Sequence, residues 1–200
     1  MTTDYASYWN AYASKVGHRT AVTPLSEQEY RNLYLDELKQ LGPANPKRIL
    51  DYGCGPALLL PIIKELWPES KYTGVDISRE MIEHCWSQWH DKNFSESEFY
   101  VLPSDELVLH YDFLICHSVF THISMEDAVA LLKTLHKLLA PGGFASISIL
   151  DEPMQDANFF GCLERVDYNF RFFQGMLVQT GFSIEKIYRR HQCYFGVRKV

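Results

Sequence analysis

The 200-residue sequence lacks long apolar runs. No stretch approaches the ~20 apolar residues that a membrane-spanning helix needs, so we expect no transmembrane segment and no membrane partner. The segment Met1 to Tyr5 has no charged region followed by an apolar stretch, and we therefore expect no secretory signal. These absences predict a cytoplasmic protein.

Positive charge is also scarce. The formal net charge is -6, and no run of Lys and Arg is longer than the pairs Lys47-Arg48 and Arg189-Arg190. Nucleic acids are bound chiefly by clustered cations, so we expect no nucleic-acid partner. The mild negative charge is expected to serve solubility.

Cysteines are few and do not form a metal or disulfide pattern. There are five, an odd number, and no pair has the spacing CxxC. This argues against a zinc site and against a disulfide framework, and we expect no metal. Cys85 and Cys116 stand among apolar neighbours and are expected to be buried.

The first 45 residues have a helical pattern, and we expect them to form an N-terminal cap on a single domain over residues 1–200. Aromatic residues recur at helical spacing at Tyr5, Tyr8, Trp9 and Tyr12. They either pack the first helix onto the sheet or form a lid over a ligand. A second helix is predicted from Ser26 to Leu41, opened by a capping box.

Short apolar runs alternate with helical periods over residues 46–200, which is typical of βαβ units. The expected strands are 48–52, 71–76, 99–102, 112–116 and 144–150. An aromatic-rich insertion is expected at 151–168, then a helix over 170–180, and a hairpin of strands 182–188 and 192–198. The prediction is an α/β fold: a doubly wound, mostly parallel seven-stranded sheet with a C-terminal antiparallel hairpin.

A tight turn between the first strand and its helix carries two glycines, Gly53 and Gly55. Glycine has no Cβ, so a ligand can approach the backbone there. Asp76 ends the next strand, 21 residues after Gly55, where an acidic residue can accept both hydroxyls of a ribose. The pattern predicts a nucleoside-containing cofactor.

Nicotinamide and flavin proteins use the same architecture, so a nicotinamide-dependent oxidoreductase is an alternative. Their fingerprint G-x-G-x-x-G needs a third glycine where this chain has Leu58. Asp51, two residues before the first glycine, would repel a pyrophosphate but suits an ammonium group. Both features favour a methionine-bearing nucleoside.

Four segments in order resemble the motifs of class I (Rossmann-like) S-adenosylmethionine-dependent methyltransferases, small bacterial type. Together they lie within residues 48–150. They are Asp51-x-Gly53-x-Gly55, Tyr72-Thr73-Gly74-Val75-Asp76-Ile77-Ser78, Asp112-Phe113-Leu114-Ile115-Cys116, and Leu138-Leu139-Ala140-Pro141-Gly142-Gly143. The departure is Ala57, where many members have a third glycine, and its small side chain leaves the assignment nearly intact.

The resemblance implies S-adenosyl-L-methionine as cofactor and a set of residues that bind it. The methionine end would meet the first strand and its loop, the ribose Asp76, the adenine the residues that follow, and the methyl group the end of the fourth strand. The implied cofactor residues are Asp51, Gly53, Gly55, Asp76, Ile77, Met81, Ser104, Asp105, Cys116 and His117.

Two histidines follow the fourth strand. Several members of the superfamily use a histidine there as a general base, so His122 and His117 are the candidate catalytic residues. The alternative for His122 is that it caps or packs against the next helix. Methyltransferases that act on nucleobase amino groups carry Asn/Asp-Pro-Pro-Tyr/Phe at this place, and this chain has Cys116-His117-Ser118-Val119 instead.

The expected function is methyl transfer to an O or N atom of a small-molecule acceptor. The alternative acceptors are a protein or a polysaccharide, and a cofactor-binding protein without activity is a further alternative. Acceptor-binding candidates are Tyr8, Tyr12, Phe159 and Phe160. The aromatic residues of the insertion form either an acceptor pocket or a small extra core or dimer contact. The oligomeric state does not follow from the sequence.

Overall fold

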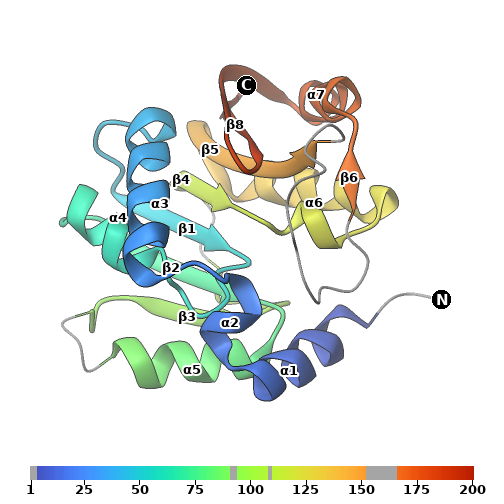
Figure 1. Ribbon diagram of the computed structural model, residues 1–200. Helices are drawn as coiled ribbons and strands as arrows, with labels where there is room; N and C mark the ends of the chain where they lie inside the picture. Colours follow the sequence, from blue (N-terminus) through green and yellow to red (C-terminus); the bar gives the residue numbers. More distant parts are fainter. Residues whose placement is uncertain (1–3, 91–93, 108–109, 152–165) are drawn as a thin grey trace. The chain divides into compact units, whose positions relative to one another are not determined.

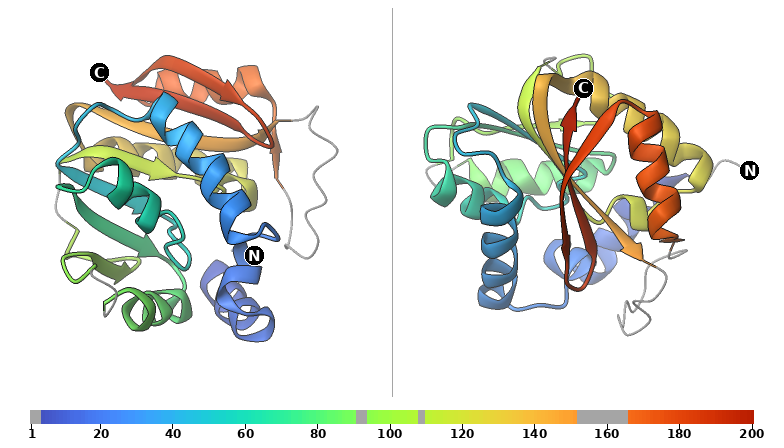
Figure 2. Two further views of the ribbon diagram at one scale, coloured as in Figure 1. Left: turned by 60° about the vertical axis from the view of Figure 1, so that its left-hand side comes forward. Right: turned by 90° about the horizontal axis from the view of Figure 1, so that it is seen from above.

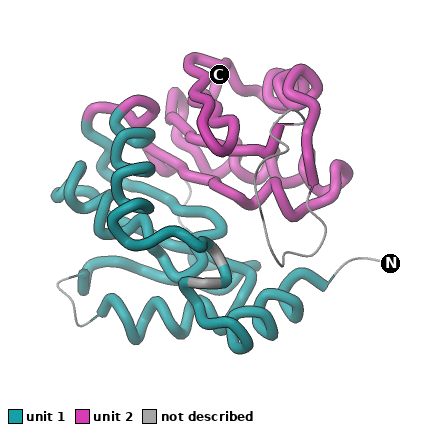
Figure 3. Tube along the Cα trace, in the orientation of Figure 1, with its two compact units in different colours: residues 1–39, 45–107 teal, residues 40–44, 108–200 magenta. Residues whose placement is uncertain are grey.

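The computed structural model describes residues 4–90, 94–107, 110–151 and 166–200. The chain divides into two compact units, which are distinguished by colour in Figure 3. Unit 1 comprises residues 1–39 and 45–107, and unit 2 comprises residues 40–44 and 108–200. Each unit is described by itself below.

The chain begins with three helices, labelled in Figure 1: α1 (Tyr5–Val16), α2 (His18–Val22) and α3 (Glu27–Leu41). Asp4 caps α1 by accepting a hydrogen bond from the amide of Ser7. The predicted capping box opens α3, because the amide of Ser26 donates to Glu29 Oε2 at 2.9 Å and the amide of Glu29 donates to Ser26 Oγ at 3.4 Å. The helical prediction for this segment is confirmed.

Unit 1 has a parallel sheet in the order β3-β2-β1. Its strands and helices are β1 (Arg48–Tyr52), α4 (Leu60–Leu66), β2 (Lys71–Asp76), α5 (Arg79–Trp89) and β3 (Glu98–Val101). Pro61 lies in the first turn of α4, where a missing amide hydrogen costs nothing. Ser78 caps α5, since its Oγ accepts from the amide of Met81 at 3.2 Å.

Unit 2 has strands in the order β4-β5-β8-β7, with the short β6 also paired to β5. β4 runs parallel to β5, whereas β8 is antiparallel to both β5 and β7. Figure 2 shows the red C-terminal hairpin of β7 and β8 in both views. The elements are β4 (Tyr111–Cys116), η1 (Phe120–His122), α6 (Met125–Leu138), β5 (Leu139–Asp151), β6 (Asp167–Tyr168), α7 (Phe170–Gln179), β7 (Phe182–Arg189) and β8 (Cys193–Lys199).

The predicted α/β class is confirmed: the sheet is mostly parallel, and the C-terminal strands are antiparallel. Two expectations need correction. β5 starts at Leu139 and continues through the Pro141-Gly142-Gly143 segment, because Gly142 takes a φ of 71° there. Residues 167 and 168 form β6 beside β5 and are not irregular.

Each unit has its own buried apolar side chains. In unit 1 they include Ile49, Leu50 and Ile63, and in unit 2 they include Phe113 and Phe195, all fully buried. Ser124 caps α6 by accepting from the amide of Asp127 at 3.2 Å. Among the described residues, every helix is too short or too polar to cross a bilayer.

Candidate active site

The loop after β1 takes a backbone conformation that favours glycine. Gly53 has a φ of 75°, Gly55 of 51° and Ala57 of 53°. L-residues enter this left-handed region at a cost of roughly 1–2 kcal/mol, which glycine avoids. The strand-to-helix turn predicted from the two glycines is therefore present, and Ala57 shares its left-handed conformation.

Asp76 ties this loop to the end of β2. Its Oδ2 accepts from the amide of Gly55 at 2.9 Å, and its Oδ1 accepts from the amide of Ser78 at 2.8 Å. Asp76 is buried, and burial raises the pKa of its carboxyl. The backbone of Ile77 also contributes a hydrogen bond that lowers the pKa of this carboxyl, in opposition to burial. The residue thus joins the glycine loop to the start of α5.

The amides of the glycine loop all donate within the protein. Those of Gly53 and Cys54 bond to the carbonyl of Val75 at 2.8 and 2.9 Å, and that of Gly55 bonds to Asp76. A dinucleotide site directs amides of this kind at a pyrophosphate. Because these three backbone amides already donate hydrogen bonds within the protein, they are not directed at a pyrophosphate. This argues against the nicotinamide-dependent alternative.

Asp51 lies at the carboxyl-terminal half of β1 and is 4% exposed. Its Oδ2 accepts from the hydroxyl of Tyr72 at 2.7 Å. Burial raises the pKa of this carboxyl to about 7, the Tyr72 hydrogen bond lowers it, and the charge of Asp76 raises it further. A cation beside Asp51 would favour the ionised form.

Two thiols surround the carbonyl of Gly55, and sequence reasoning had not connected them. Cys54 Sγ lies 3.5 Å and Cys85 Sγ 3.1 Å from that oxygen. Cys85 is fully buried, as predicted. Gly74 on β2 makes room for this packing, because a Cβ there would lie 3.0 Å from Cys54 Sγ. Only the fold brings α5 to the glycine loop, so the spacing alone gave no signal.

The remaining unit 1 candidates occupy different surroundings. Ile77 is 38% exposed just after Asp76, whereas Met81 is 2% exposed and packs with Ala13 and Ala21. Tyr12 packs against that same cluster. Tyr8 stacks on Tyr12 with their ring centroids 5.7 Å apart. Tyr12 and Met81 thus join α1 to α5.

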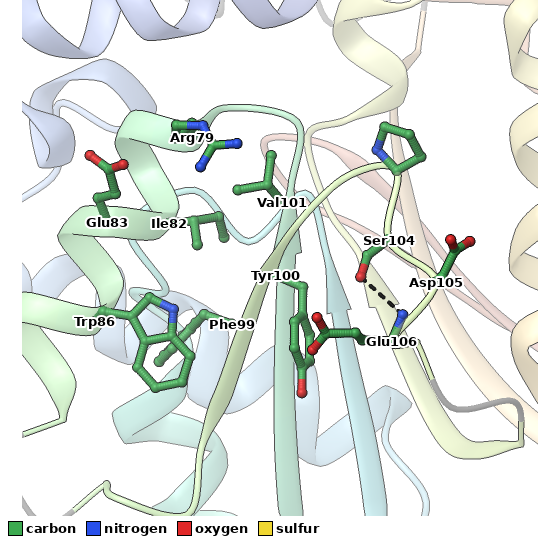
Figure 4. A pocket seen from close by; sticks show the side chains of 11 residues that line it. Arg79, Ile82, Glu83, Trp86, Phe99, Tyr100, Val101, Ser104, Asp105 and Glu106 are labelled. Atoms are coloured by element: carbon green, nitrogen blue, oxygen red, sulfur yellow. Dashed lines mark hydrogen bonds between the residues drawn. The ribbon is translucent and has the colours of Figure 1, made fainter.

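Ser104 and Asp105 line a pocket of about 480 Å³ between α5 and β3 (Figure 4). Trp86 of α5 and Tyr100 of β3 lie on its walls. The hydroxyl of Ser104 accepts from the amide of Glu106 at 3.2 Å, which holds the loop after β3. Asp105 is exposed at this pocket and is open to a ligand.

In unit 2, the end of β4 buries Cys116 and His117. His117 Nε2 lies 2.8 Å from Ser146 Oγ, and its ring meets Tyr194 edge-on at 5.1 Å. Burial lowers the pKa of His117 to about 3, with a further contribution from His191. His122 ends η1, and burial lowers its pKa to about 4. Both imidazoles are neutral at pH 7.

A polar cluster lies next to His117, and sequence reasoning missed its members from β5 and the hairpin. Ser118 has a φ of 58°, its amide donates to Ser148 Oγ at 2.9 Å, and its Oγ accepts from Gln192 Nε2 at 2.8 Å. Ser146 and Ser148 are fully buried, and Gln192 is 1% exposed. The alternating serines of β5 between apolar residues were the available signal. No sequence pattern pointed to Gln192, because only the pairing of the β7–β8 hairpin with β5 brings this residue to the end of β4.

The other acceptor candidates, Phe159 and Phe160, lie outside the described residues. Next to that segment, Arg189 Nη2 lies 3.4 Å from the buried Asp151 Oδ2. The guanidinium of Arg189 also lies 4.2 Å from the ring centre of Phe170. This pairing places a cation in the hairpin.

Residues 26–196 match the family described as "Methyltransferase domain" (Methyltransf_23), and the chain belongs to that family. It is 36% identical over 109 residues to an uncharacterized protein of Rickettsia prowazekii, and 30% identical over 121 residues to trans-aconitate 2-methyltransferase of Rhodopseudomonas palustris. These matches cover 53% and 58% of this chain, but only 44% and 43% of the relatives. The chain thus spans less than half of each relative.

Among solved structures, the chain is similar to magnesium protoporphyrin IX methyltransferase from Synechocystis with bound S-adenosylhomocysteine. The TM-score is 0.74 at 17% identity, with 98% of both chains covered. The predicted class I S-adenosylmethionine-dependent methyltransferase fold is thereby confirmed. S-adenosylmethionine is the cofactor of this family.

The residues of unit 1 fit that cofactor. Asp51 is a buried carboxyl with a raised pKa, which an ammonium group would stabilise in its charged form. Asp76 is a buried acceptor at the end of β2, and the loop between them has glycine where a side chain would hinder close approach.

Proposed function

We propose that this protein transfers the methyl group of S-adenosylmethionine to an oxygen or nitrogen atom of a small-molecule acceptor. When bound, S-adenosylmethionine supplies an electrophilic methyl group that an acceptor lone pair can take up directly. The protein's own task is then to hold the two molecules in line. Such positioning contributes roughly 7–11 kcal/mol to a reaction.

The roles proposed for the residues follow from their places. Asp51 faces the ammonium end, Asp76 accepts from the ribose hydroxyls, and the two loop glycines allow close approach. Ile77, Ser104 and Asp105 are assigned to the adenine, and Cys116 and His117 to the surroundings of the reacting methyl group. Met81 supports the adenine side indirectly, because it is buried against α1 and α2.

The observation that carries the choice of acceptor is the desolvation of the two histidines. With pKa values of about 3 and about 4, His117 and His122 are weak bases. A general base works best when its pKa lies near the working pH. The site therefore favours a nucleophile that needs no deprotonation, such as a carboxylate oxygen or a neutral amine. Trans-aconitate, named for one relative, is a carboxylate of this kind.

The test has two stages. Differential scanning fluorimetry with S-adenosylhomocysteine should raise the melting temperature, whereas NAD should not, because a ligand stabilises the state that binds it. Radiolabelled S-adenosylmethionine is then incubated with a panel of carboxylic acids, amines and phenols. A product that releases volatile label at high pH is a methyl ester, and a stable one is an amine or ether.

His122→Ala separates the mechanisms. We expect its turnover with a carboxylate or amine to stay within about twofold of the wild type. A large loss with a bell-shaped pH profile that loses one limb would instead assign His122 as the base. Labelled product found only on protein or polysaccharide would overturn the small-molecule proposal.

A further inference from the structure

Gln192 holds an unusual position in unit 2. It lies in the turn between β7 and β8, is 1% exposed, and donates through Nε2 to Ser118 Oγ at 2.8 Å. Its other amide atom, Oε1, is buried and has no hydrogen-bond partner among the described residues. One end of the amide is therefore anchored and the other is open.

An open buried carbonyl is costly. Leaving such an acceptor unsatisfied destabilises the folded state, and the large majority of buried polar atoms in proteins are paired. The bond from Nε2 to Ser118 Oγ accounts for one end of the amide, but it does not offset the cost at Oε1. The cost is offset if a ligand supplies the missing donor.

The anchor of Gln192 is itself held firmly. The amide of Ser118 donates to Ser148 Oγ at 2.9 Å, and Thr121 Oγ1 donates to the Ser118 carbonyl at 2.6 Å. These bonds keep Ser118 at a φ of 58°, a conformation that costs energy for a serine. Strained residues fixed by their surroundings concentrate at ligand sites.

The place also fits a ligand. Ser118 is the second residue after the carboxyl end of β4, which pairs in parallel with β5. In open α/β sheets, ligands bind outside the carboxyl ends of parallel strands. The open end of the Gln192 amide belongs to a cluster at that end of the strand.

We propose that Gln192 determines acceptor specificity: its buried Oε1 accepts a hydrogen bond from an O–H or N–H group of the methyl acceptor, while Ser118 anchors the amide. This rests on the proposed function. It narrows the acceptor class to small molecules that carry a hydrogen-bond donor besides the methylated atom, such as hydroxy acids or amino-substituted acids.

The first test is stability, which needs no acceptor. Gln192→Met keeps the volume and loses the open carbonyl, but it also loses the hydrogen bond from Nε2 to Ser118 Oγ. These two changes oppose each other, so the melting temperature of the variant should stay within about two degrees of the wild type. The matched control is Gln179→Met at the exposed end of α7. A drop of several degrees confined to Gln192→Met would assign Gln192 to the fold and overturn the proposal.

The second test uses matched pairs in the methylation assay: malate with succinate, citrate with tricarballylate, and salicylate with benzoate. For a pair that yields product, the wild type should prefer the hydroxylated member by at least tenfold in kcat/KM. Gln192→Met should lose that preference through KM, with kcat and S-adenosylhomocysteine affinity unchanged, and Gln179→Met should retain it. Methylation with the same preference in wild type and Gln192→Met overturns this inference and leaves the proposed function standing.

A spectroscopic readout completes the design. In an amide-resolved NMR spectrum of the protein loaded with S-adenosylhomocysteine, the Gln192 side-chain signal is the one missing from Gln192→Met. It should shift when the preferred hydroxylated acid is added and stay in place with its deoxy partner. A shift of equal size with both acids would contradict a hydrogen bond to Oε1.

Discussion

The loop after β1 in unit 1 and the turn after β4 in unit 2 follow the ends of parallel strands, and each contains a non-glycine residue with positive φ. The loop after β1 is held by its main chain, through positive φ angles at glycines and through amides that bond to Val75 and Asp76. The second is built from side chains that come from β5 and the hairpin. In the proposed function, the methyl donor is held by backbone and two carboxylates at the first turn, whereas the acceptor is recognised by side chains at the second.

Asp76→Ala should have the largest effect, a loss of affinity for the methyl donor and its product. Two hydrogen bonds to a carboxylate are lost, each worth about 1.5–3 kcal/mol, so the affinity for S-adenosylhomocysteine should fall at least ~100-fold. Isothermal titration calorimetry measures it, with the exposed Glu69→Ala as control. Because Asp76 also accepts a hydrogen bond from Gly55, the melting temperature of Asp76→Ala should fall as well. Unchanged affinity would remove the assumption on which the donor site depends.

Asp51→Asn should lower the affinity for the methyl donor and raise the stability of the fold. The pKa of the folded carboxyl is about 7 against an ordinary 3.8, so the folded protein takes up a proton between these values. The free energy of unfolding of the wild type should therefore fall as the pH rises from about 4 to about 7, and the penalty is complete above that.

The asparagine variant can still accept from Tyr72 but carries no charge to bury. At pH 8 we expect its melting temperature to exceed that of the wild type by several degrees, and its affinity for S-adenosylhomocysteine to be roughly tenfold lower. Thermal unfolding between pH 5 and 8 gives the comparison. Parallel pH curves for the two proteins would show that Asp51 is not the titrating group.

Much of unit 1 was predictable from the sequence, and less of unit 2. The strand and loop at Asp51 and Gly53, the cap at Ser78 and the acid at Asp76 are local patterns whose geometry follows from neighbouring residues. The Ser118–Gln192 contact joins positions 74 residues apart and depends on the antiparallel pairing of β5 and β8. No periodicity encodes such a contact. Burial is the main cause of the lowered pKa values of His117 and His122, and burial depends on the tertiary fold.

Substitution of Ser118, in the turn after β4, should change stability by an intermediate amount. Ser118→Ala and Ser118→Gly both lose the hydroxyl that anchors Gln192, but only glycine relieves the positive φ. The glycine variant should be more stable than the alanine variant by about 1 kcal/mol in urea unfolding. Equal stability would mean that the turn relaxes to a different conformation when the hydroxyl is lost.

Ala57→Gly should have the smallest effect. Relief of the left-handed conformation contributes roughly 1–2 kcal/mol, while the lost buried methyl group costs about 0.8 kcal/mol and the more flexible unfolded chain about 0.4–1 kcal/mol. The free energy of unfolding should thus change by less than about 1 kcal/mol. Ala57→Val, which adds bulk at a fully buried position, should lose more, and urea unfolding compares the two.

The side chain of Asn10 in α1 bears on how the donor site would be protected. Its Oδ1 accepts from Ser78 Oγ at 2.8 Å and from the amide of Glu80 at 3.2 Å, so α1 completes the cap of α5 two residues beyond Asp76. Detachment of α1 would uncover that cap. Trypsin cleavage at Lys15 should accordingly slow when S-adenosylhomocysteine is bound, and a chain shortened past Val16 should retain its sheet but hold the nucleoside poorly.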